Sequence, residues 1–322
     1  MRARRSSLIR FLLVKNCRYH DRMDRDPGGS AVSVITAAYN GVGVIGRQMD
    51  ALATQGTTFP WEYVVVDNGS SDETIDLVRA HAVNFPVPVR IVDGSLSRSI
   101  PYVRNLGVEN SSSPYLVFCD QDDVVQPGWL QAAYDALVLH PACMGLIRSL
   151  DGPTPGRTMN PSVLTSFPLV ETCNFAVRKD VLVRAGGFDE GLPGYGGDDS
   201  ELALRLRLLG YHIQGVPDMV ILAQQTTGSV ARIKKVFKSA QSEVYIWRKY
   251  PEVFPGRLTW NHVARRFLSS SRELITGLLG RAATSRARAA RGIVASVGNA
   301  YAMLVRRGET VTPWRPPGPD RS

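Results

Sequence analysis

From residue 31 onward, short apolar runs alternate with segments whose apolar residues recur at helical spacing. The apolar runs predict strands at residues 31–37, 62–66, 89–92 and 115–119, and the periodic segments predict helices at residues 44–55, 70–83, 101–109 and 128–140. Strands that are apolar throughout and separated by helices are typical of a parallel sheet covered on both faces. The pattern predicts an α/β fold whose ligands bind beyond the carboxyl ends of the strands.

The helix at residues 70–83 carries a start signal. Ser70 and Glu73 fit the S-x-x-E capping box, in which each side chain accepts the other residue's backbone N–H. We therefore expect this helix to begin near Ser70 and to run to about Val83.

Charge is distributed unevenly along the 322 residues, which carry a net charge of +9 in total. Residues 1–30 have a net charge of +5, residues 230–322 of +13, and residues 31–229 of −9. An acidic centre disfavours a nucleic-acid groove and suits a metal-assisted site. The basic flanks suggest contact with an anionic membrane surface, although charge that serves only solubility explains them almost as well.

The fourth apolar run ends in the acidic segment FCDQDD, residues 118–123. Asp120 and Asp122 lie two positions apart, so a tight turn can aim both carboxylates at one hard divalent cation, which in turn can hold a diphosphate. A solvated acidic turn is the simpler alternative, and Asp123 could serve only to cap the next turn. Trp129, which follows, fits a core or loop anchor better than a platform on which a sugar stacks.

A literal G-x-G-x-x-G, GVGVIG at residues 41–46, follows the first predicted strand, and Asp67 stands 21 residues after its last glycine. This spacing resembles a dinucleotide-binding fingerprint. Three residues, Ala38, Tyr39 and Asn40, separate the strand from the first glycine, whereas the fingerprint places that glycine at the strand end. A glycine-rich loop that enters a helix is the better interpretation.

A second acidic pair, Asp198 and Asp199, follows a glycine-rich loop and precedes a predicted helix at residues 200–209. A helix N-terminus stabilises ionised carboxylates. Plain N-capping explains the pair. A catalytic base needs the same ionised, oriented carboxylate beside a loop that admits substrate.

Four segments together resemble glycosyltransferase family 2 with a GT-A fold. They are SVITAAYN (33–40), VVVDNGSSDET (64–74), RNLGVENSSSPYLVFCDQDD (104–123) and GGFDEGLPGYGGDDSELALRL (186–206). They occur in the family's order, and the resemblance covers about residues 31–225. It implies a Rossmann-like domain with a mostly parallel sheet that transfers a sugar, of hexosyl type, from a nucleotide donor.

The resemblance also implies roles for the donor-side residues. Asp67 would bind the nucleotide base, and Tyr39 and Arg104 would line the same pocket. Asp120 would lie near the ribose and the metal, and Asp122 would bind the Mn²⁺ or Mg²⁺ that bridges the diphosphate. Arg104 could instead pair with a surface acid, and Tyr39 could be a packing residue.

On the acceptor side, the resemblance makes Asp199 the base that takes the acceptor hydroxyl proton in a single displacement with inversion. Asp198, where the family often has Glu, would orient the acceptor or support Asp199, and the order of the two could be shifted by one.

The chain departs from the family in two respects. Many relatives place a metal-binding histidine in the strand after the base helix, where this chain has Ala223, Gln224 and Gln225. The metal would then have only carboxylate, phosphate and water ligands, which favours hard cations. The chain also lacks the Gln-x-x-Arg-Trp motif of processive polysaccharide synthases, which argues for the addition of one sugar per encounter.

The flanks differ in composition from the centre. We expect a basic leader at residues 1–30, the catalytic domain at residues 31–228, a basic helical extension at residues 229–310 with helices at 230–249 and 262–279, and a proline-rich tail at residues 311–322. Four cysteines without C-x-x-C spacing favour a reducing compartment. No uncharged run reaches the roughly 20 residues of a membrane span.

The sequence therefore predicts an inverting, metal-dependent glycosyltransferase that acts in the cytoplasm, with attachment to the inner membrane face left open. Its partners would be a nucleotide-sugar donor, with UDP-sugars the first choice, and a glycan or lipid-linked acceptor in cell-surface assembly, with no nucleic acid. Two alternatives remain: an NAD(P)-binding oxidoreductase that uses GVGVIG, and a non-catalytic binding protein with a basic tail.

Overall fold

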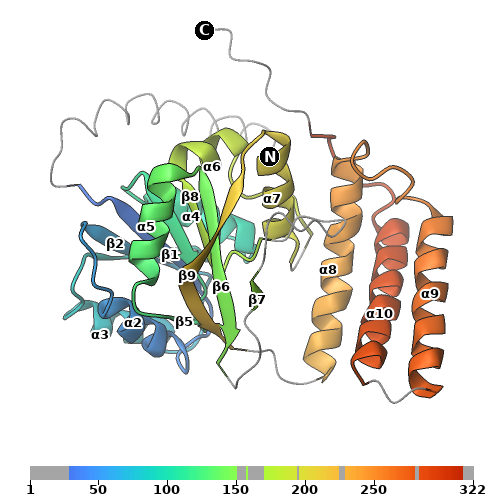
Figure 1. Ribbon diagram of the computed structural model, residues 1–322, viewed down its shortest axis with the longest axis horizontal. Coiled ribbons are helices and arrows are strands. Elements are labelled where there is room, and N and C mark those ends of the chain that lie inside the picture. The colour runs from blue at the N-terminus through green and yellow to red at the C-terminus, as the bar shows by residue number, and fades with distance from the viewer. Residues whose placement is uncertain are drawn as a thin grey trace, which may run out of the picture. The chain divides into compact units, whose positions relative to one another are not determined.

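The computed structural model describes residues 29–150, 157–158, 170–193, 196–224, 229–279 and 283–314 (Figure 1). The chain forms two compact units. The first comprises Met1–Glu190 and Leu202–Gln225, and the second comprises Gly191–Glu201 and Thr226–Ser322. The segment Gly191–Glu201, which the sequence places in the catalytic domain, thus clusters with the C-terminal helices.

A mixed sheet forms the centre of the first unit (Figure 1). Its strands run in the order β3-β2-β1-β4-β8-β6-β9-β5, and β7 pairs with β6. They are β1 (Val32–Ala38), β2 (Trp61–Asp67), β3 (Val89–Asp93), β4 (Tyr115–Cys119), β5 (Val124–Val125), β6 (Ala142–Ser149), β7 (Arg157–Thr158), β8 (Asn174–Arg178) and β9 (Ile213–Ala223). Strands β1 to β4 are parallel, whereas β8 runs antiparallel to both β4 and β6.

Helices cover both faces of this sheet. One apolar cluster packs the sheet against α2 (Ile45–Ala53), α3 (Thr74–Ala82) and α5 (Trp129–Leu139). A second cluster packs the opposite face against α4 (Ile100–Asn110), α6 (Lys179–Ala185) and the part of α7 (Asp198–Leu208) that follows Glu201. The expected two-sided α/β architecture is confirmed.

The predicted capping box at Ser70 and Glu73 is wrong. Helix α3 begins at Thr74, and the side chain of its N-cap residue, Glu73, makes no capping hydrogen bond. Asp72 accepts the Thr74 N–H at 3.1 Å and the Thr74 hydroxyl proton. The Ser70 hydroxyl instead accepts the backbone N–H of Asn40 at 3.1 Å. The S-x-x-E residues therefore belong to the loop between β2 and α3. A hydrogen bond connects this loop to the loop after β1.

The register of the parallel strands brings their carboxyl ends to one edge of the sheet. Ala38 at the end of β1 is paired with Asp67 at the end of β2, and Asp67 is paired with Asp93 on β3. On the other side of β1, Ile35 is paired with Phe118, one residue before the end of β4. The loops that contain Tyr39, Asp67 and Asp120 therefore leave the sheet at the same edge.

Asn174 joins β8 to its neighbours at the start of the strand. Its side-chain amide donates to the carbonyls of Met219 at 2.9 Å and Leu146 at 3.1 Å, and its Oδ1 accepts the Trp129 indole N–H at 2.7 Å. Trp129 is fully buried, so it is a core anchor, as the sequence favoured. A buried amide with three such bonds fixes the segment that leads into β8.

Three helices dominate the second unit: α8 (Ser229–Lys249), α9 (Trp260–Leu279) and α10 (Ala283–Val305). Helix α10 packs against both α8 and α9 and lies between them (Figure 1). The predicted helices at 230–249 and 262–279 are confirmed, and α10 is an addition. Among the described residues, no helix is long and apolar enough to cross a membrane.

Candidate functional site

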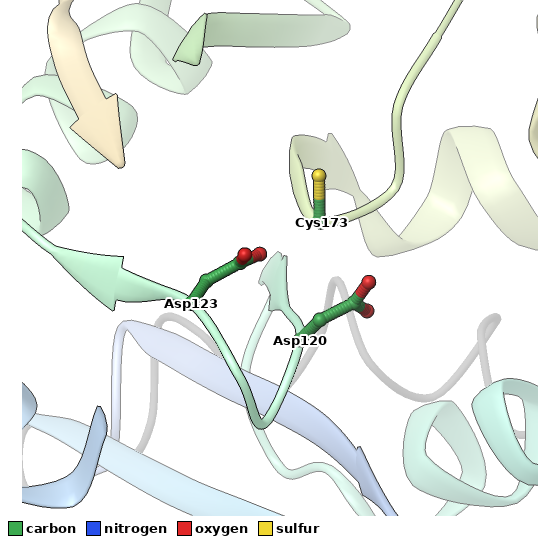
Figure 2. A group of neighbouring side chains, drawn as sticks. All are labelled: Asp120, Asp123 and Cys173. Atoms are coloured by element: carbon green, nitrogen blue, oxygen red, sulfur yellow. The ribbon is translucent and has the colours of Figure 1, made fainter. Parts of the chain in front are cut away.

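Three potential metal ligands converge at the carboxyl end of β4. Ligand atoms of Asp120, Asp123 and Cys173 all lie within 4.8 Å of one another. Figure 2 shows that both carboxylates come from the turn after β4, and that Cys173 comes from the segment before β8. The antiparallel pairing of β4 with β8, in which Cys119 is opposite Asn174, brings these two segments together.

Asp123 is the buried member of this group, with 4% of its surface exposed. Burial, followed by the negative charges of Asp120 and Asp122, raises the pKa of the Asp123 carboxyl to about 9. Its Oδ2 has no hydrogen-bond partner among the described residues. A buried carboxylate oxygen in this state is costly unless a cation or a proton satisfies it.

The donor set fits a divalent cation. Two carboxylates supply the hard oxygen ligands that Mg²⁺ and Mn²⁺ prefer, and the half-buried thiol of Cys173 is a softer third group. Asp122, which the sequence paired with Asp120, is half-buried and is not part of the three-residue group found among the described residues. Its role as a metal ligand stays a prediction.

Arg104 lies beside Asp120. Its Nη2 is 3.6 Å from Asp120 Oδ1, and its guanidinium lies over the ring of Phe188 at 5.6 Å from the ring centroid. Only 12% of the Arg104 side chain is exposed. The neighbouring Asn105 exchanges hydrogen bonds with the backbone of Phe188 at 2.8 and 2.9 Å. Helix α4 thus fixes both the arginine and the loop after α6.

Tyr39 lies on the loop after β1, and a second arginine contacts its ring. The Arg98 guanidinium lies 5.4 Å from the ring centroid and donates to the Tyr39 hydroxyl at 3.0 Å. The side chain of Gln121 pairs with the Tyr39 backbone, because it accepts the N–H and donates to the carbonyl, both at 2.9 Å. Gln121, the middle residue of the Asp-x-Asp motif, therefore ties the turn after β4 to the loop after β1.

The hydrogen bonds between the Gln121 side chain and the Tyr39 backbone leave no room for a side chain at residue 41. A Cβ atom on Gly41 would lie 2.3 Å from Gln121 Oε1, so any side chain there would displace the amide. A Cβ on Gly43 would meet nothing within 4 Å, and one on Gly46 would approach only His81 and Leu77 at ordinary distances. The glycine at 41 is therefore explained by the close approach of Gln121, and no dinucleotide is needed to account for it.

Asp67 ends β2 as expected and is half-buried. Its Oδ1 accepts the N–H of Ser70 at 3.0 Å, and its backbone carbonyl accepts the N–H of Gly94 at 2.7 Å. Asp93 lies beside it at the end of β3, where hydrogen bonds from Ser95 lower the pKa of the Asp93 carboxyl. The edge that holds Tyr39 and Asp120 thus also presents two carboxylates next to each other.

Asp198 and Asp199 belong to the second unit, in the first turn of α7. Asp198 is buried, whereas Asp199 is half-buried and accepts the Ser200 N–H at 2.7 Å. Two residues further on, the fully buried Glu201 accepts hydrogen bonds from Lys249 and Tyr250 of the α8 end, both at 2.5 Å. These bonds anchor the turn that carries the acidic pair to α8.

Comparison with known proteins places this site in a family. The model for glycosyl transferase family 2 matches residues 33–188, and a model described as the N-terminal domain of galactosyltransferase matches residues 166–234. Together with the curated relatives, these matches support glycosyltransferase family 2 for this chain. The first match includes all of the residues described above at this edge of the sheet, from Tyr39 to Cys173.

Curated relatives of the glycosyltransferase are distant. Validoxylamine A glucosyltransferase from Streptomyces hygroscopicus subsp. jinggangensis is 25% identical over 71% of this chain and 63% of the relative. Glycosyltransferase AglE from Haloferax volcanii is 26% identical over 67% of this chain and 74% of that protein. The chain spans about three fifths of the length of the validoxylamine A glucosyltransferases that it matches.

Solved structures confirm the GT-A fold of the glycosyltransferase. Mannosyltransferase PcManGT from Pyrobaculum calidifontis, in complex with GDP-Man and Mn²⁺, aligns with a TM-score of 0.61 and 18% identity over 92% of this chain and 96% of that chain. S. aureus TarS 1–349 in complex with UDP-GlcNAc aligns with a TM-score of 0.52 and 17% identity over 87% and 92% of the two chains. At such identities the likeness establishes the fold.

Sequence reasoning missed four residues of the candidate site: Arg98, Gln121, Asp123 and Cys173. Gln121 and Asp123 lie inside the acidic segment at residues 118–123, but only the tertiary structure shows which of its side chains contact other segments. Arg98 and Cys173 lie in segments without any motif. Their place beside Tyr39 and Asp120 follows from strand order, which the local sequence does not encode.

Gly41→Ala should disrupt the donor side of the glycosyltransferase, because the new methyl group would expel the Gln121 amide. We expect a melting temperature several degrees lower, as for a loss of about 1–2 kcal/mol, and weakened binding of UDP or GDP in the presence of Mn²⁺, measured by calorimetry. Gly43→Ala is the matched control and should leave both properties unchanged. Equal loss in the two variants would contradict the assigned role of Gly41.

Proposed function

We propose that the enzyme transfers one hexosyl group from a nucleoside-diphosphate sugar to an acceptor hydroxyl, with inversion at the anomeric carbon and with Mn²⁺ or Mg²⁺ as cofactor. The observation that carries the proposal is the convergence of Asp120 and Asp123 at the carboxyl end of β4, with Arg104 beside them. A cation and an arginine at one strand edge suit a diphosphate, because both neutralise phosphate oxygens.

The donor nucleotide would bind along the edge formed by β1, β2 and β4. Asp67 is proposed to accept a hydrogen bond from the base, and the Tyr39 ring, held by Arg98, would form one wall of the pocket. Asp120 would contact the ribose and the metal, and Arg104 would approach the diphosphate. These roles agree with the depth of the residues, since the Arg104 side chain is nearly buried and Tyr39 is 39% exposed.

Asp120 and Asp123 are proposed to hold the cation, with Asp122 as a further candidate from the sequence. When bound, the cation would neutralise the charge that develops on the departing nucleoside diphosphate. The raised pKa of the Asp123 carboxyl agrees with this assignment. Burial disfavours its ionised form, and a bound cation would stabilise that form.

Asp199 is proposed as the catalytic base. Its carboxylate would take the proton of the acceptor hydroxyl as that oxygen bonds to the anomeric carbon and the bond from carbon to the diphosphate oxygen breaks. The first turn of α7 favours the ionised form that a base requires. Asp198, which is buried, is proposed to orient the acceptor or to support Asp199.

The proposal also covers the donor base and the acceptor. The similar structures include complexes with GDP-Man and with UDP-GlcNAc, so both bases occur among neighbours. We propose a UDP-sugar as the first donor to test, and a glycan or lipid-linked acceptor in cell-surface assembly.

We also propose that the enzyme works in the cytoplasm on the inner face of the membrane, attached through α9. Exposed apolar side chains line one side of this helix: Trp260, Phe267, Leu268 and Ile275. The exposed side chains of Arg265 and Arg272 lie beside them. An apolar stripe with flanking arginines suits the interface of an anionic bilayer.

Metal dependence is tested by calorimetric titration of UDP and GDP into the protein with Mn²⁺ or with EDTA. One nucleotide should bind only with Mn²⁺, and Asp120→Asn or Asp123→Asn should weaken that binding about ten-fold or more. Mn²⁺ should also raise the melting temperature of the parent protein but not of Asp123→Asn. Asp122→Asn decides the role of Asp122, and Asp218→Asn, an exposed acid on β9, is the control. Binding that persists in EDTA would refute the metal site.

Asp199→Asn should lower kcat by about 10²–10⁴-fold, because the amide cannot accept the acceptor proton but keeps the oxygen that binds Ser200 N–H. Donor affinity should stay nearly constant, since the base acts on the acceptor. The control is Asp180→Asn, which removes an acid from the first turn of α6. A parallel loss of donor affinity would exclude Asp199 as the base.

Leu268→Glu should reduce co-sedimentation with vesicles that contain phosphatidylglycerol, because it places a carboxylate in the apolar stripe of α9. Leu139→Glu changes an exposed leucine on α5 and should have no effect. Membrane attachment through α9 is excluded if the two variants sediment alike.

A further inference from the structure

The helices of the second unit line an open pocket that the proposed reaction does not use. Its volume is about 570 Å³, within the range of roughly 300–1,000 Å³ for small-molecule sites. One face of each helix contributes to its lining, which comprises Lys235, Val236, Ser239, Ala240 and Glu243 of α8, Arg266 of α9, and Arg288, Arg291, Gly292 and Ala295 of α10.

Small residues on α10 explain why a hollow exists between closely packed helices. A Cβ on Gly292 would lie 2.2 Å from the Ser270 hydroxyl of α9, and a Cβ on Gly298 would lie 2.8 Å from the Phe237 carbonyl of α8. Helix α10 therefore lies very close to both neighbours. At the same level Gly292 and Ala295 provide no bulk, so the space between the longer side chains stays open.

The lining is strongly cationic. Four basic side chains, those of Lys235, Arg266, Arg288 and Arg291, face a single carboxylate, Glu243. Glu243 is already engaged, because it accepts Arg266 Nη1 at 2.6 Å and Asn299 Nδ2 at 3.1 Å. The cations come from three helices around one hollow, so their charge is concentrated there and is not spread along a solvated face.

The ion pair at the base of the pocket is held rigidly. Asn299 is fully buried, donates to the Ala240 carbonyl at 2.7 Å and accepts Arg266 Nη1 at 3.0 Å. This network fixes one guanidinium, while Arg288 and Arg291 lie at the exposed side of the pocket. A fixed cation with two exposed arginines on the adjacent helix offers the fork-shaped donors that fit phosphate oxygens.

We propose that this pocket binds a phosphate-bearing group, carried either by a lipid headgroup or by a soluble molecule. Ser239 of the lining also lies beside the loop that leads to Asp199, because its hydroxyl is 3.5 Å from the position that a Cβ on Gly196 would take. The site lies on the helices of the second unit and does not depend on which donor or acceptor the enzyme uses.

The test is calorimetric titration of the full chain with inorganic pyrophosphate and, separately, with dihexanoyl phosphatidic acid, which is monomeric in water. We expect both to bind at low ionic strength, and the Arg288→Gln/Arg291→Gln double variant to lose about ten-fold or more in affinity. The matched control is Arg232→Gln/Arg286→Gln, which removes the same charge from exposed positions outside the lining. Circular dichroism verifies that both variants fold.

The two ligands separate the sources of the phosphate group. Tighter binding of phosphatidic acid identifies a lipid headgroup, and tighter binding of pyrophosphate identifies a soluble phosphate. The proposal is overturned if neither binds, or if the control variant loses as much affinity as the pocket variant. The Leu268→Glu protein, whose change lies outside the pocket, should bind both ligands normally, so failure of membrane attachment and failure of the pocket are distinguishable.

Discussion

The parallel pairing of β1 with both β2 and β4 is the constraint on which the candidate site depends. Because the three strands run in the same direction and end together, the loops with Tyr39, Asp67 and Asp120 emerge at one edge. Strand β8 pairs antiparallel to β4, so the residue just before it, Cys173, lies at the same edge of the sheet as Asp120. A shift of one residue in either register would move every side chain of the strand into the apolar cluster on the opposite face, so the packing of the two clusters also fixes the site.

Much of the first unit could be predicted from the sequence, because strands buried on both faces leave an uninterrupted apolar signal. The run from Tyr115 to Cys119 was predicted to the residue. The predicted capping box does not form, because the Ser70 hydroxyl accepts the backbone N–H of Asn40 in another loop, a contact that no local pattern reveals. The place of Asp123 beside Asp120 also depends on tertiary structure, since burial of one acid among three cannot be read from their spacing.

The second unit is specified by different means. Its sequence is rich in arginine, so composition alone suggests a solvated surface, yet glycines on α10 bring the helices close together. Charged side chains then meet over these small residues, as Glu243 and Arg266 do. The turn that carries Asp199 is held in a similar way, by the buried Glu201 and its bonds to Lys249 and Tyr250. A buried charge is stable only when neighbouring groups pair with it in a fixed geometry.

Gly41 and the Gln121 side chain are in steric conflict if residue 41 carries a side chain, although the two positions are far apart in the sequence. The Gln121 amide occupies the volume that a side chain at residue 41 would need. It also accepts the Tyr39 N–H and donates to the Tyr39 carbonyl. A relative with a short residue at position 121 would have room for a side chain at position 41 but would have to hold the loop by other means. Across the family these two positions should therefore covary, although 80 residues of chain separate them.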